Sequence, residues 1–505
     1  MVLYSIFITS VSEMPQMFGD ARMLQRHFSH DHIITVTAGE LSISNIPGSL
    51  HVAVRALTAR RLRTATVSMQ SLTAQEIITL KMGILLKNVR LAGRPGTERT
   101  DIYIEGDRIS SIGTEPSGFS PDETVDCSDK TVLPGLINCH THAYMSLMRN
   151  YADDLPFQTW LFDRVMPIED SLTAEDAYWG NLLSIMEMIR TGTTTFVDMQ
   201  MFPRMAVRAC LESGMRAVIT RGLVGENRED EGAKKRLSEA FDEMEYGRET
   251  GAPCMFGLGP HAIYTCGGDL LRYTAELADE KGLMLNIHLT ESENEYETCC
   301  REHGMTPVEY LDSLGMLDRH ILLAHCVYLK DSDYALLKRP NVHVVLNPAS
   351  NMKLANGFAP AARMLKEGIH LCLGTDGPAS NNSLNLFSEM RLLSLSQKGV
   401  TRDAVALTAA DTLCLATKNG AEAIGRVDLG SVQAGKTADL ILIDETAPNL
   451  RPDYNLTAAL VYSATGCEVS DVMIGGKMVM RDRQLTTIDE ERVLREVERI
   501  AARYR

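Results

Sequence analysis

Histidines and acidic residues recur at the ends of short apolar runs in the middle of this chain. The first run leads into Asn138-Cys139-His140-Thr141-His142, and residues two positions apart on a strand face the same side. Later runs lead into four further residues of this kind, which are His261, His288, His325 and Asp376. Three imidazole nitrogens and one carboxylate form a donor set that suits zinc or iron. The sequence therefore predicts a metal site made by His140, His142, His288 and Asp376.

Eight apolar runs are spaced along the region that carries these residues. They span residues 132–138, 195–199, 217–220, 255–259, 284–289, 321–325, 342–346 and 371–375. Strands that are buried on both faces of a parallel sheet have this near-continuous apolar character. Helix-like stretches separate the runs, and two of them end at Gly192 and Gly282, as helix C-termini commonly do. We therefore predict an α/β fold, a (β/α)8 TIM barrel, with its chemistry at the carboxyl ends of the strands.

Short strands with glycine-rich turns flank the predicted barrel on both sides. The turn Gly106-Asp107 lies before the barrel, and the turn Gly475-Gly476 lies after it. We expect the two flanks to combine in one small, discontinuous β-sandwich domain. The predicted boundaries are 82–134 plus 428–485 for this β domain, 135–427 for the barrel and 486–505 for a C-terminal helix.

Residues 1–81 differ in composition from the rest of the chain. They hold seven Lys or Arg against five Asp or Glu, whereas the whole chain has a net charge of −16. Their apolar pattern is weak, and a clear strand pattern begins only after Met82. We expect residues 1–81 to be an unassigned N-terminal extension, either disordered or the product of a start site set too early.

Composition excludes several classes of protein. The chain has 505 residues, of which 45% are hydrophobic, and its apolar runs fall far short of the roughly 20 residues that a membrane span requires. A net charge of −16 repels a phosphate backbone, so nucleic acid is not an expected partner. Eleven cysteines without a Cys-x-x-Cys spacing are typical of reduced thiols. We expect a soluble cytoplasmic protein that acts on a small molecule and has no membrane partner.

The histidine and aspartate motifs resemble those of the amidohydrolase superfamily of metal-dependent hydrolases. Within it, the segments are similar to the 5-methylthioadenosine/S-adenosylhomocysteine deaminases, including the archaeal 5'-deoxyadenosine deaminases. The segments that carry the resemblance are 133–148 (LPGLINCHTHAYMSLM), 167–170 (PIED), 259–261 (GPH), 288–291 (HLTE), 347–357 (NPASNMKLANG) and 374–382 (GTDGPASNN). The resemblance covers residues 82–485 and none of 1–81.

The resemblance implies hydrolytic deamination of an adenine ring and a role for each site residue. Glu291 would take a proton from the attacking water and deliver it to ring N1, as a non-ligand glutamate does in zinc deaminases. His325 and Asp376 would orient the water and stabilise the tetrahedral intermediate. The substrate-binding residues would be Glu169 for the ribose hydroxyls, Arg221 for the 5' substituent, His261 for the sugar or base, and again Glu291 and Asp376.

The expected cofactor is one divalent metal per subunit, with zinc favoured over iron. Binuclear barrels of this type need a bridging carboxylated lysine at a strand end. The fourth strand offers His261 there instead, and the nearest lysine, Lys281, lies at the end of a helix. The resemblance further implies a homo-oligomer, such as a tetramer.

Two other readings remain open at this point. The same superfamily includes guanine and cytosine deaminases and triazine chlorohydrolases, whose substrates lack a ribose and would not need Glu169 or Arg221. A barrel without enzymatic activity, serving as a scaffold, is the second alternative, although every metal and proton-transfer position is filled. The sequence does not rank 5'-deoxyadenosine, 5'-methylthioadenosine, S-adenosylhomocysteine and adenosine as substrates.

Overall fold

The computed structural model describes residues 82–93 and 98–504, together with four short strands nearer the N-terminus. The chain divides into two compact units, Met1–Lys81 and Met82–Arg505. The first unit contains β1 (His32–Thr37), β2 (Glu40–Asn45), β3 (His51–Val54) and β4 (Thr66–Ser68), joined in the order β2-β1-β3-β4. The other residues before Met82 lie outside the described residues, so the prediction for 1–81 stays a prediction.

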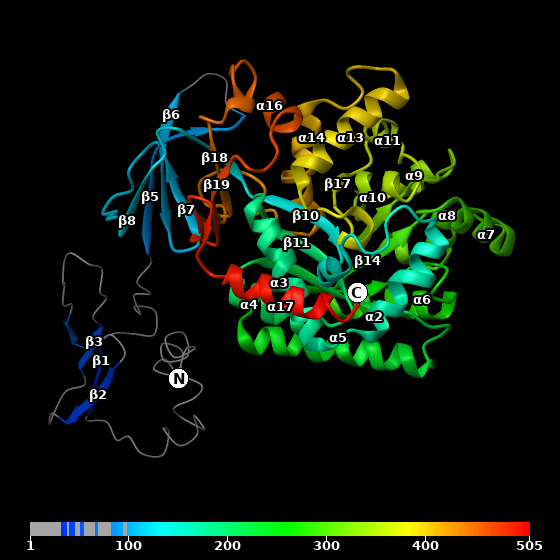
Figure 1. Ribbon diagram of the computed structural model, residues 1–505, viewed down its shortest axis with the longest axis horizontal. Coiled ribbons are helices and arrows are strands. Elements are labelled where there is room, and N and C mark those ends of the chain that lie inside the picture. Colours follow the sequence, from blue (N-terminus) through cyan, green and yellow to red (C-terminus); the bar gives the residue numbers. More distant parts are fainter. Residues whose placement is uncertain are drawn as a thin grey trace. The chain divides into compact units, whose positions relative to one another are not determined.

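Eight parallel strands form the centre of the second unit (Figure 1). In hydrogen-bonded order they are β10 (Leu136–Thr141), β11 (Thr193–Gln200), β12 (Arg216–Leu223), β13 (Cys254–Pro260), β14 (Met284–Leu289), β15 (Ile321–His325), β16 (Val342–Leu346) and β17 (Leu371–Leu373). Every residue of β10, β11 and β14 to β17 is buried, which explains the largely apolar sequences of β14 to β17. The predicted TIM barrel is confirmed.

Contacts just beyond β17 bring the last strand back to the first. The backbone N–H groups of Thr375 and Asp376 donate to the His140 carbonyl, with N···O distances of 3.1 and 2.9 Å. The Asn138 side chain reinforces this closure, because it donates to the Thr375 hydroxyl at 2.7 Å and accepts from the Thr375 N–H at 3.1 Å. Asp376 is thereby held beside His140, although 236 positions separate them in the chain.

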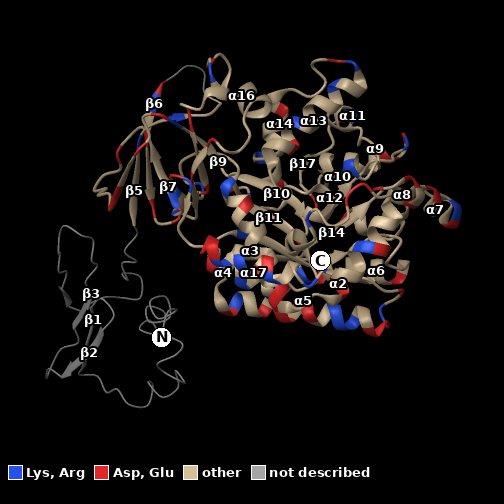
Figure 2. Cartoon of the chain, viewed as in Figure 1, with Lys and Arg blue, Asp and Glu red and all other residues tan. Residues whose placement is uncertain are grey.

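Helices cover the outside of the barrel. The longer ones are α3 (Ala174–Arg190), α4 (Pro203–Ser213), α5 (Glu231–Thr250), α6 (Gly268–Lys281), α7 (Glu293–His303) and α13 (Leu386–Thr401). The shorter ones are α8 (Pro307–Ser313), α9 (Asp333–Leu337), α10 (Pro348–Lys353), α11 (Ala361–Glu367), α12 (Pro378–Asn381), α14 (Ala409–Leu415), α15 (Lys418–Ala423) and α16 (Leu456–Tyr462). Five of them end at a left-handed glycine, at Gly214, Gly251, Gly282, Gly304 and Gly368. Figure 2 shows that acidic and basic residues are interspersed along the outer helices α4 and α5.

The segment between β10 and α3 is helical and covers the mouth of the barrel on one side. It contains η2 (Ala143–Met148), the π-helix η3 (Thr159–Val165) and α2 (Met166–Ser171). Trp160 of η3 is buried and donates its indole N–H to the Ala379 carbonyl at 3.2 Å. This contact ties the segment to α12, close to the end of β17.

A nine-stranded sheet built from both flanks forms the small β domain. The first flank supplies β5 (Gly83–Leu91), β6 (Arg99–Glu105), β7 (Arg108–Ile112), β8 (Glu123–Asp126) and β9 (Lys130–Pro134). The second supplies β18 (Leu440–Asp444), β19 (Val469–Ile474), β20 (Lys477–Arg481) and β21 (Gln484–Leu485). β9 pairs antiparallel with β18, and residues of both flanks share one apolar core. The prediction that the two flanks make one β domain is confirmed.

The predicted first barrel strand, 132–138, is divided between two sheets. Residues up to Pro134 belong to β9 of the β domain, and β10 of the barrel begins at Leu136. Gly135 marks the division because a Cβ there would lie 2.1 Å from the Thr194 hydroxyl. The Gly135 backbone therefore lies directly against the Thr194 side chain, at a point where the apolar pattern itself does not change.

The helix α17 (Glu490–Ala501) follows the β domain and packs along α3. Glu490 pairs with Arg190 of α3, and Arg503 pairs with Asp176 at the other end of the same helix. The Ser171 hydroxyl donates to the Tyr504 hydroxyl at 3.2 Å, so the C-terminal residues reach α2 (Figure 1). No helix among the described residues has the length and apolar character needed to cross a bilayer.

Candidate active site

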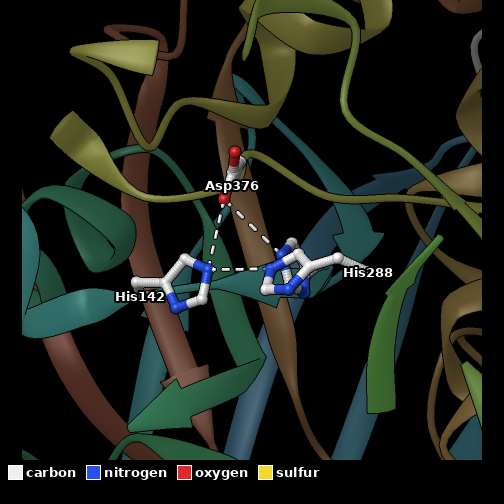
Figure 3. A group of neighbouring side chains, drawn as sticks. His142, His288 and Asp376 are labelled. Carbon is white, nitrogen blue, oxygen red and sulfur yellow. Dashed lines mark hydrogen bonds and ion pairs between the residues drawn. The ribbon is translucent and has the colours of Figure 1, made fainter. Parts of the chain in front are cut away.

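Four side chains converge at the carboxyl ends of β10, β14 and β17. His140, His142, His288 and Asp376 each offer one ligand atom, and all four atoms lie within 4.8 Å of one another. The Nε2 atoms of His140 and His142 lie 3.5 and 3.4 Å from Asp376 Oδ1. Figure 3 shows His142, His288 and Asp376 pointing toward one common space. The structure thus brings together the four residues that the sequence predicts as metal ligands.

Two backbone carbonyls determine which nitrogen of the histidines is free. His142 Nδ1 lies 2.9 Å from the Met199 carbonyl, and His288 Nδ1 lies 2.8 Å from the His261 carbonyl. A carbonyl can only accept, so both Nδ1 atoms carry the proton and both Nε2 atoms present a lone pair. These two Nε2 atoms are 3.2 Å apart. Facing lone pairs at this distance repel, and a cation bound between them removes the repulsion.

His140 provides a second sign that the cluster fits a cation. Its side chain is fully buried, and neither ring nitrogen has a hydrogen-bond partner among the described residues. Burial lowers its pKa to about 4, so the ring is neutral at pH 7 and can donate an electron pair. An unpartnered buried polar group is costly unless it has a ligand. Three imidazoles and one carboxylate therefore fit a divalent metal.

Asp376 is held rigidly in its ionised form. Its Oδ1 accepts from the Gly377 N–H at 2.7 Å, and its Oδ2 accepts from the hydroxyls of Ser350 and Ser380 at 2.7 and 2.8 Å. Burial by itself raises the pKa of Asp376, but the His140 ring, whose Nε2 lies 3.5 Å from Oδ1, and the charges of the surrounding histidines outweigh burial and hold the pKa well below the usual range. Asp376 is thus a charged ligand that cannot swing away easily.

Glu291 and His325 lie next to this cluster. Together with Asp376 they form a second group whose ligand atoms lie within 4.8 Å of one another. Glu291 Oε2 is 3.8 Å from His325 Nε2, and Asn351 Oδ1 lies 2.8 Å from His325 Nδ1. Burial, followed by the charge of Asp376, raises the pKa of Glu291 well above its ordinary value. A carboxyl in this state can hold a proton near neutral pH, as a general acid and base must.

Glu169 lies on α2, within the helical segment that covers the mouth. The Tyr144 hydroxyl of η2 donates to Glu169 Oε1. Burial raises the pKa of Glu169 to about 7, although this hydrogen bond opposes the shift. The carboxylate is therefore already oriented by one hydroxyl donor and can accept from others.

His261 and Arg221 occupy the ends of neighbouring strands. The His261 ring packs against the His288 ring with centroids 4.8 Å apart, and its Nδ1 lies 2.9 Å from the Thr265 hydroxyl. Burial and the nearby histidines lower the pKa of His261 to about 4. The apolar run 217–220 places Arg221 just after the strand. In the structure β12 extends to Leu223, so Arg221 lies within the strand.

Arg221 already has partners in this structure. Its Nε donates to Glu239 of α5 at 2.9 Å, and its Nη1 donates to the carbonyls of Gly222 and Gln200 at 2.9 and 3.4 Å. A substrate carboxylate would therefore meet a guanidinium that is paired with Glu239. Nothing in the sequence pattern indicates that Glu239 would compete with a substrate for Arg221.

Several residues that support the site have no role in the sequence prediction. They are Tyr144, Glu295, Ser350, Asn351 and Asn356. Three of these fall in the segment 347–357, whose dense small polar residues are the one available signal. The strand ends are also unusual in their backbone, because Thr290, His325 and Asp376 adopt positive φ values of 49°, 80° and 61°. Such residues cluster at functional sites.

Comparison with known proteins agrees with this geometry. Residues 131–479 match the model of the Amidohydrolase family. A 5-methylthioadenosine/S-adenosylhomocysteine deaminase from Thermoanaerobacter pseudethanolicus is 43% identical over 430 residues, which cover 83% of this chain and 99% of the relative. A 5'-deoxyadenosine deaminase from Methanothermobacter thermautotrophicus is 41% identical over 427 residues, which cover 83% of this chain and 98% of the relative.

Solved structures show the same fold. An adenosine deaminase from Xanthomonas campestris with bound zinc aligns with a TM-score of 0.79 and 30% identity, covering 84% of this chain and 98% of that protein. An atrazine chlorohydrolase from Arthrobacter aurescens, complexed with zinc, aligns with a TM-score of 0.76 and 22% identity, covering 83% of this chain and all of that protein. The second likeness concerns the fold alone.

Proposed function

Because this chain belongs to the amidohydrolase family, we propose that it is a hydrolase that deaminates adenosine-type nucleosides. Water replaces the 6-amino group of the adenine ring, and the products are the inosine analogue and ammonia. One observation carries the proposal. The four candidate ligands, Glu291 and His325 meet at the barrel mouth, and the relatives that share the fold at about 42% identity are deaminases of such nucleosides.

We infer that His140, His142, His288 and Asp376 hold one divalent metal. The unpartnered nitrogens of His140 and the facing Nε2 atoms of His142 and His288 support this. Such a metal acts as a Lewis acid and makes water nucleophilic near neutral pH. Zinc is the favoured ion, because nitrogen-rich sites with one carboxylate suit it and the deaminase from Xanthomonas campestris has zinc bound.

Glu291 is the proposed proton carrier. It accepts a proton from the attacking water and passes it to N1 of the ring, and a second transfer lets the amino group leave as ammonia. Its raised pKa supports this role, since a carboxylate with a low pKa would be too weak a base to accept the proton from water. His325, whose Nε2 lies 3.8 Å from Glu291 Oε2, and Asp376 would orient the water and stabilise the tetrahedral intermediate.

Glu169, His261 and Arg221 are the proposed substrate-binding residues. Two hydroxyls of a ribose can donate to the two oxygens of Glu169, which is a geometry that a free base cannot use. His261, packed beside His288, is close enough to the ligand cluster to contact the base or sugar. Arg221 would face the 5' substituent and bind the carboxylate of S-adenosylhomocysteine.

The proposal extends to the assembly and the compartment. All eleven cysteines are free thiols, as expected in a reducing cytoplasm. We propose a homo-oligomer, a tetramer being one form, and sedimentation of the purified protein would measure its state.

Purified protein and a panel of nucleosides test the activity. 5'-Deoxyadenosine, 5'-methylthioadenosine, S-adenosylhomocysteine and adenosine should each show the absorbance change from adenine to hypoxanthine, with one ammonia released per turnover. Guanine, cytosine and a chlorinated triazine serve as controls. Turnover of one of these controls without turnover of any nucleoside would refute the proposal.

A further inference from the structure

Glu295 is a buried acid that contacts the backbone of the turn carrying Glu291. Its side chain is 4% exposed, and it lies in the first turn of α7. Its Oε1 accepts from the Thr290 N–H at 3.0 Å, and its Oε2 accepts from the Glu291 N–H at 2.9 Å. Both oxygens therefore bind consecutive peptide groups, one of which belongs to the proposed proton carrier.

These contacts differ from ordinary helix capping. In a capping box the acid at the third helical position accepts from the N–H of the N-cap residue. The N-cap of α7 is Ser292, whose hydroxyl does accept from the Glu295 N–H, at 3.3 Å. The Glu295 carboxylate, however, reaches past Ser292 to the two residues before it. Stabilising the helix does not require its carboxylate to accept from residues that precede the N-cap.

The turn that Glu295 contacts has an unfavourable backbone. Thr290 has a φ of 49°, a value that is uncommon for any residue with a Cβ and rare for a β-branched one. The Thr290 carbonyl accepts from the N–H groups of Val327 and Tyr328 at 3.1 and 3.3 Å, which links the turn to the segment after β15. Hydrogen bonds to both the N–H and the carbonyl of Thr290 thus stabilise a positive-φ conformation that is unfavourable for a threonine by itself.

Asn356 contacts the side chain of Glu291 from another direction. Its Nδ2 donates to Glu291 Oε1 at 3.2 Å, and Asn356 is 6% exposed. The other oxygen, Oε2, faces His325 Nε2 at 3.8 Å. The two oxygens of Glu291 are therefore unequal, because one has a fixed donor and only the other is free to take a proton.

We propose that Glu295 and Asn356 form a clamp that positions Glu291 for proton transfer through Oε2. Glu295 holds the backbone, and Asn356 holds Oε1. Both are positioning residues, since they act through Glu291. The inference rests on the role proposed above for Glu291.

The test uses Glu295→Gln and Asn356→Ala in the full-length, metal-loaded protein. Glutamine keeps the shape but replaces one acceptor by an N–H group that opposes a peptide N–H. We expect kcat to fall roughly 10- to 100-fold in each variant, because a misplacement of about 1 Å can cost about 100-fold. KM and metal content should stay within about twofold of wild type. Asn356→Ala changes no backbone contact, so it carries the test if Glu295→Gln does not fold.

A double-mutant cycle with Glu291→Gln separates positioning from general damage. In the Glu291→Gln background, both clamp substitutions should leave the residual turnover unchanged, because the group they position is gone. Glu468→Gln is the matched control. Glu468 is a buried glutamate that accepts two consecutive peptide N–H groups, those of Thr465 and Gly466, both at 2.9 Å, in the β domain. It should lower the melting temperature without changing kcat.

Three results would overturn the clamp. They are kcat values within twofold of wild type, losses that add fully to that of Glu291→Gln, and loss of bound metal as the cause of lost activity. Wild-type kcat in Glu291→Gln itself would instead refute the proposed function of Glu291. The two failures are therefore distinguishable in one set of proteins.

Discussion

The ion pair between Arg221 and Glu239 allows a quantitative prediction about substrate choice. Arg221→Gln should weaken catalysis with S-adenosylhomocysteine selectively, because that nucleoside carries a carboxylate that the guanidinium can bind. 5'-Methylthioadenosine and 5'-deoxyadenosine have no such group. The matched variant Glu239→Gln frees Arg221 from its partner on α5 and should act in the opposite direction.

The magnitude follows from the contacts that the substrate must replace. A hydrogen bond between charged groups contributes roughly 1.5–3 kcal/mol. The Glu239 side chain is 36% exposed, and ion pairs of exposed groups contribute about 0.2–1 kcal/mol, which must be given up. The net gain is then roughly 0.5–2.8 kcal/mol, or about 2- to 100-fold in kcat/KM at tenfold per 1.36 kcal/mol. Glu239→Gln should raise kcat/KM for S-adenosylhomocysteine by about 1.4- to 5-fold.

Steady-state kinetics on three nucleosides provide the assay. In Arg221→Gln, kcat/KM should fall only for S-adenosylhomocysteine and stay within about twofold for the other two. An equal loss on all three would show that Arg221 supports strands β11 and β12, to whose carbonyls at Gln200 and Gly222 it also donates. No loss on any substrate would show that the pair with Glu239 persists during turnover. Either result would refute the reasoning.

Four further predictions concern the metal, the proton carrier, the ribose contact and the N-terminal unit. Glu291→Gln should keep its metal, measured by elemental analysis, and lose about 10²- to 10⁴-fold in kcat, whereas loss of metal would make Glu291 a ligand. Chelation should abolish turnover and lower the melting temperature, because a ligand bound only to the folded state stabilises it, and added zinc should restore both. The KM of ribonucleosides should decrease as the pH rises through about 7, where Glu169 loses its proton, and Glu169→Gln should flatten this profile. Because the pKa of Glu169 is higher in the folded protein than in the unfolded chain, the folded protein binds more protons between the ordinary pKa of a glutamate and about 7. The contribution of Glu169 to the free energy of unfolding therefore decreases as the pH rises through that range. A protein that begins at Met82 should fold and turn over like the full chain, and lost solubility or activity would show that residues 1–81 contribute to either.

Local sequence was sufficient for the barrel because its strands are buried on both faces. Runs such as 321–325 and 342–346 consist almost entirely of apolar residues, and only the interior of a parallel sheet accepts such a strand. The same criterion fails at 132–138, where one apolar run serves two sheets. The division at Gly135 depends on the close approach of Thr194, a residue 59 positions away.

Local sequence also carried the composition of the site. The types and spacing of His140, His142, His288 and Asp376 indicate a metal donor set, and the family resemblance of the segment 288–291 (HLTE) implies the role of Glu291. The binding of a metal and the roles of these residues stay predictions, but the four donor atoms do lie within 4.8 Å of one another. Strand ends in a barrel converge on one face, so placement at strand ends is enough to predict that these side chains share a site.

Tertiary structure alone decided how each group is held. His142 and His288 are oriented by the carbonyls of Met199 and His261, and every residue has a carbonyl, so no residue type signals that contact. Glu295 reads in sequence as an ordinary acid in the first turn of a helix, yet it binds the peptide groups that position Glu291. The sequence suggests that Arg221 is a free cation, yet in the structure it forms an ion pair with Glu239. Residue types therefore determine which chemistry is available, whereas distances between remote segments determine which atom, in which protonation state, faces the substrate.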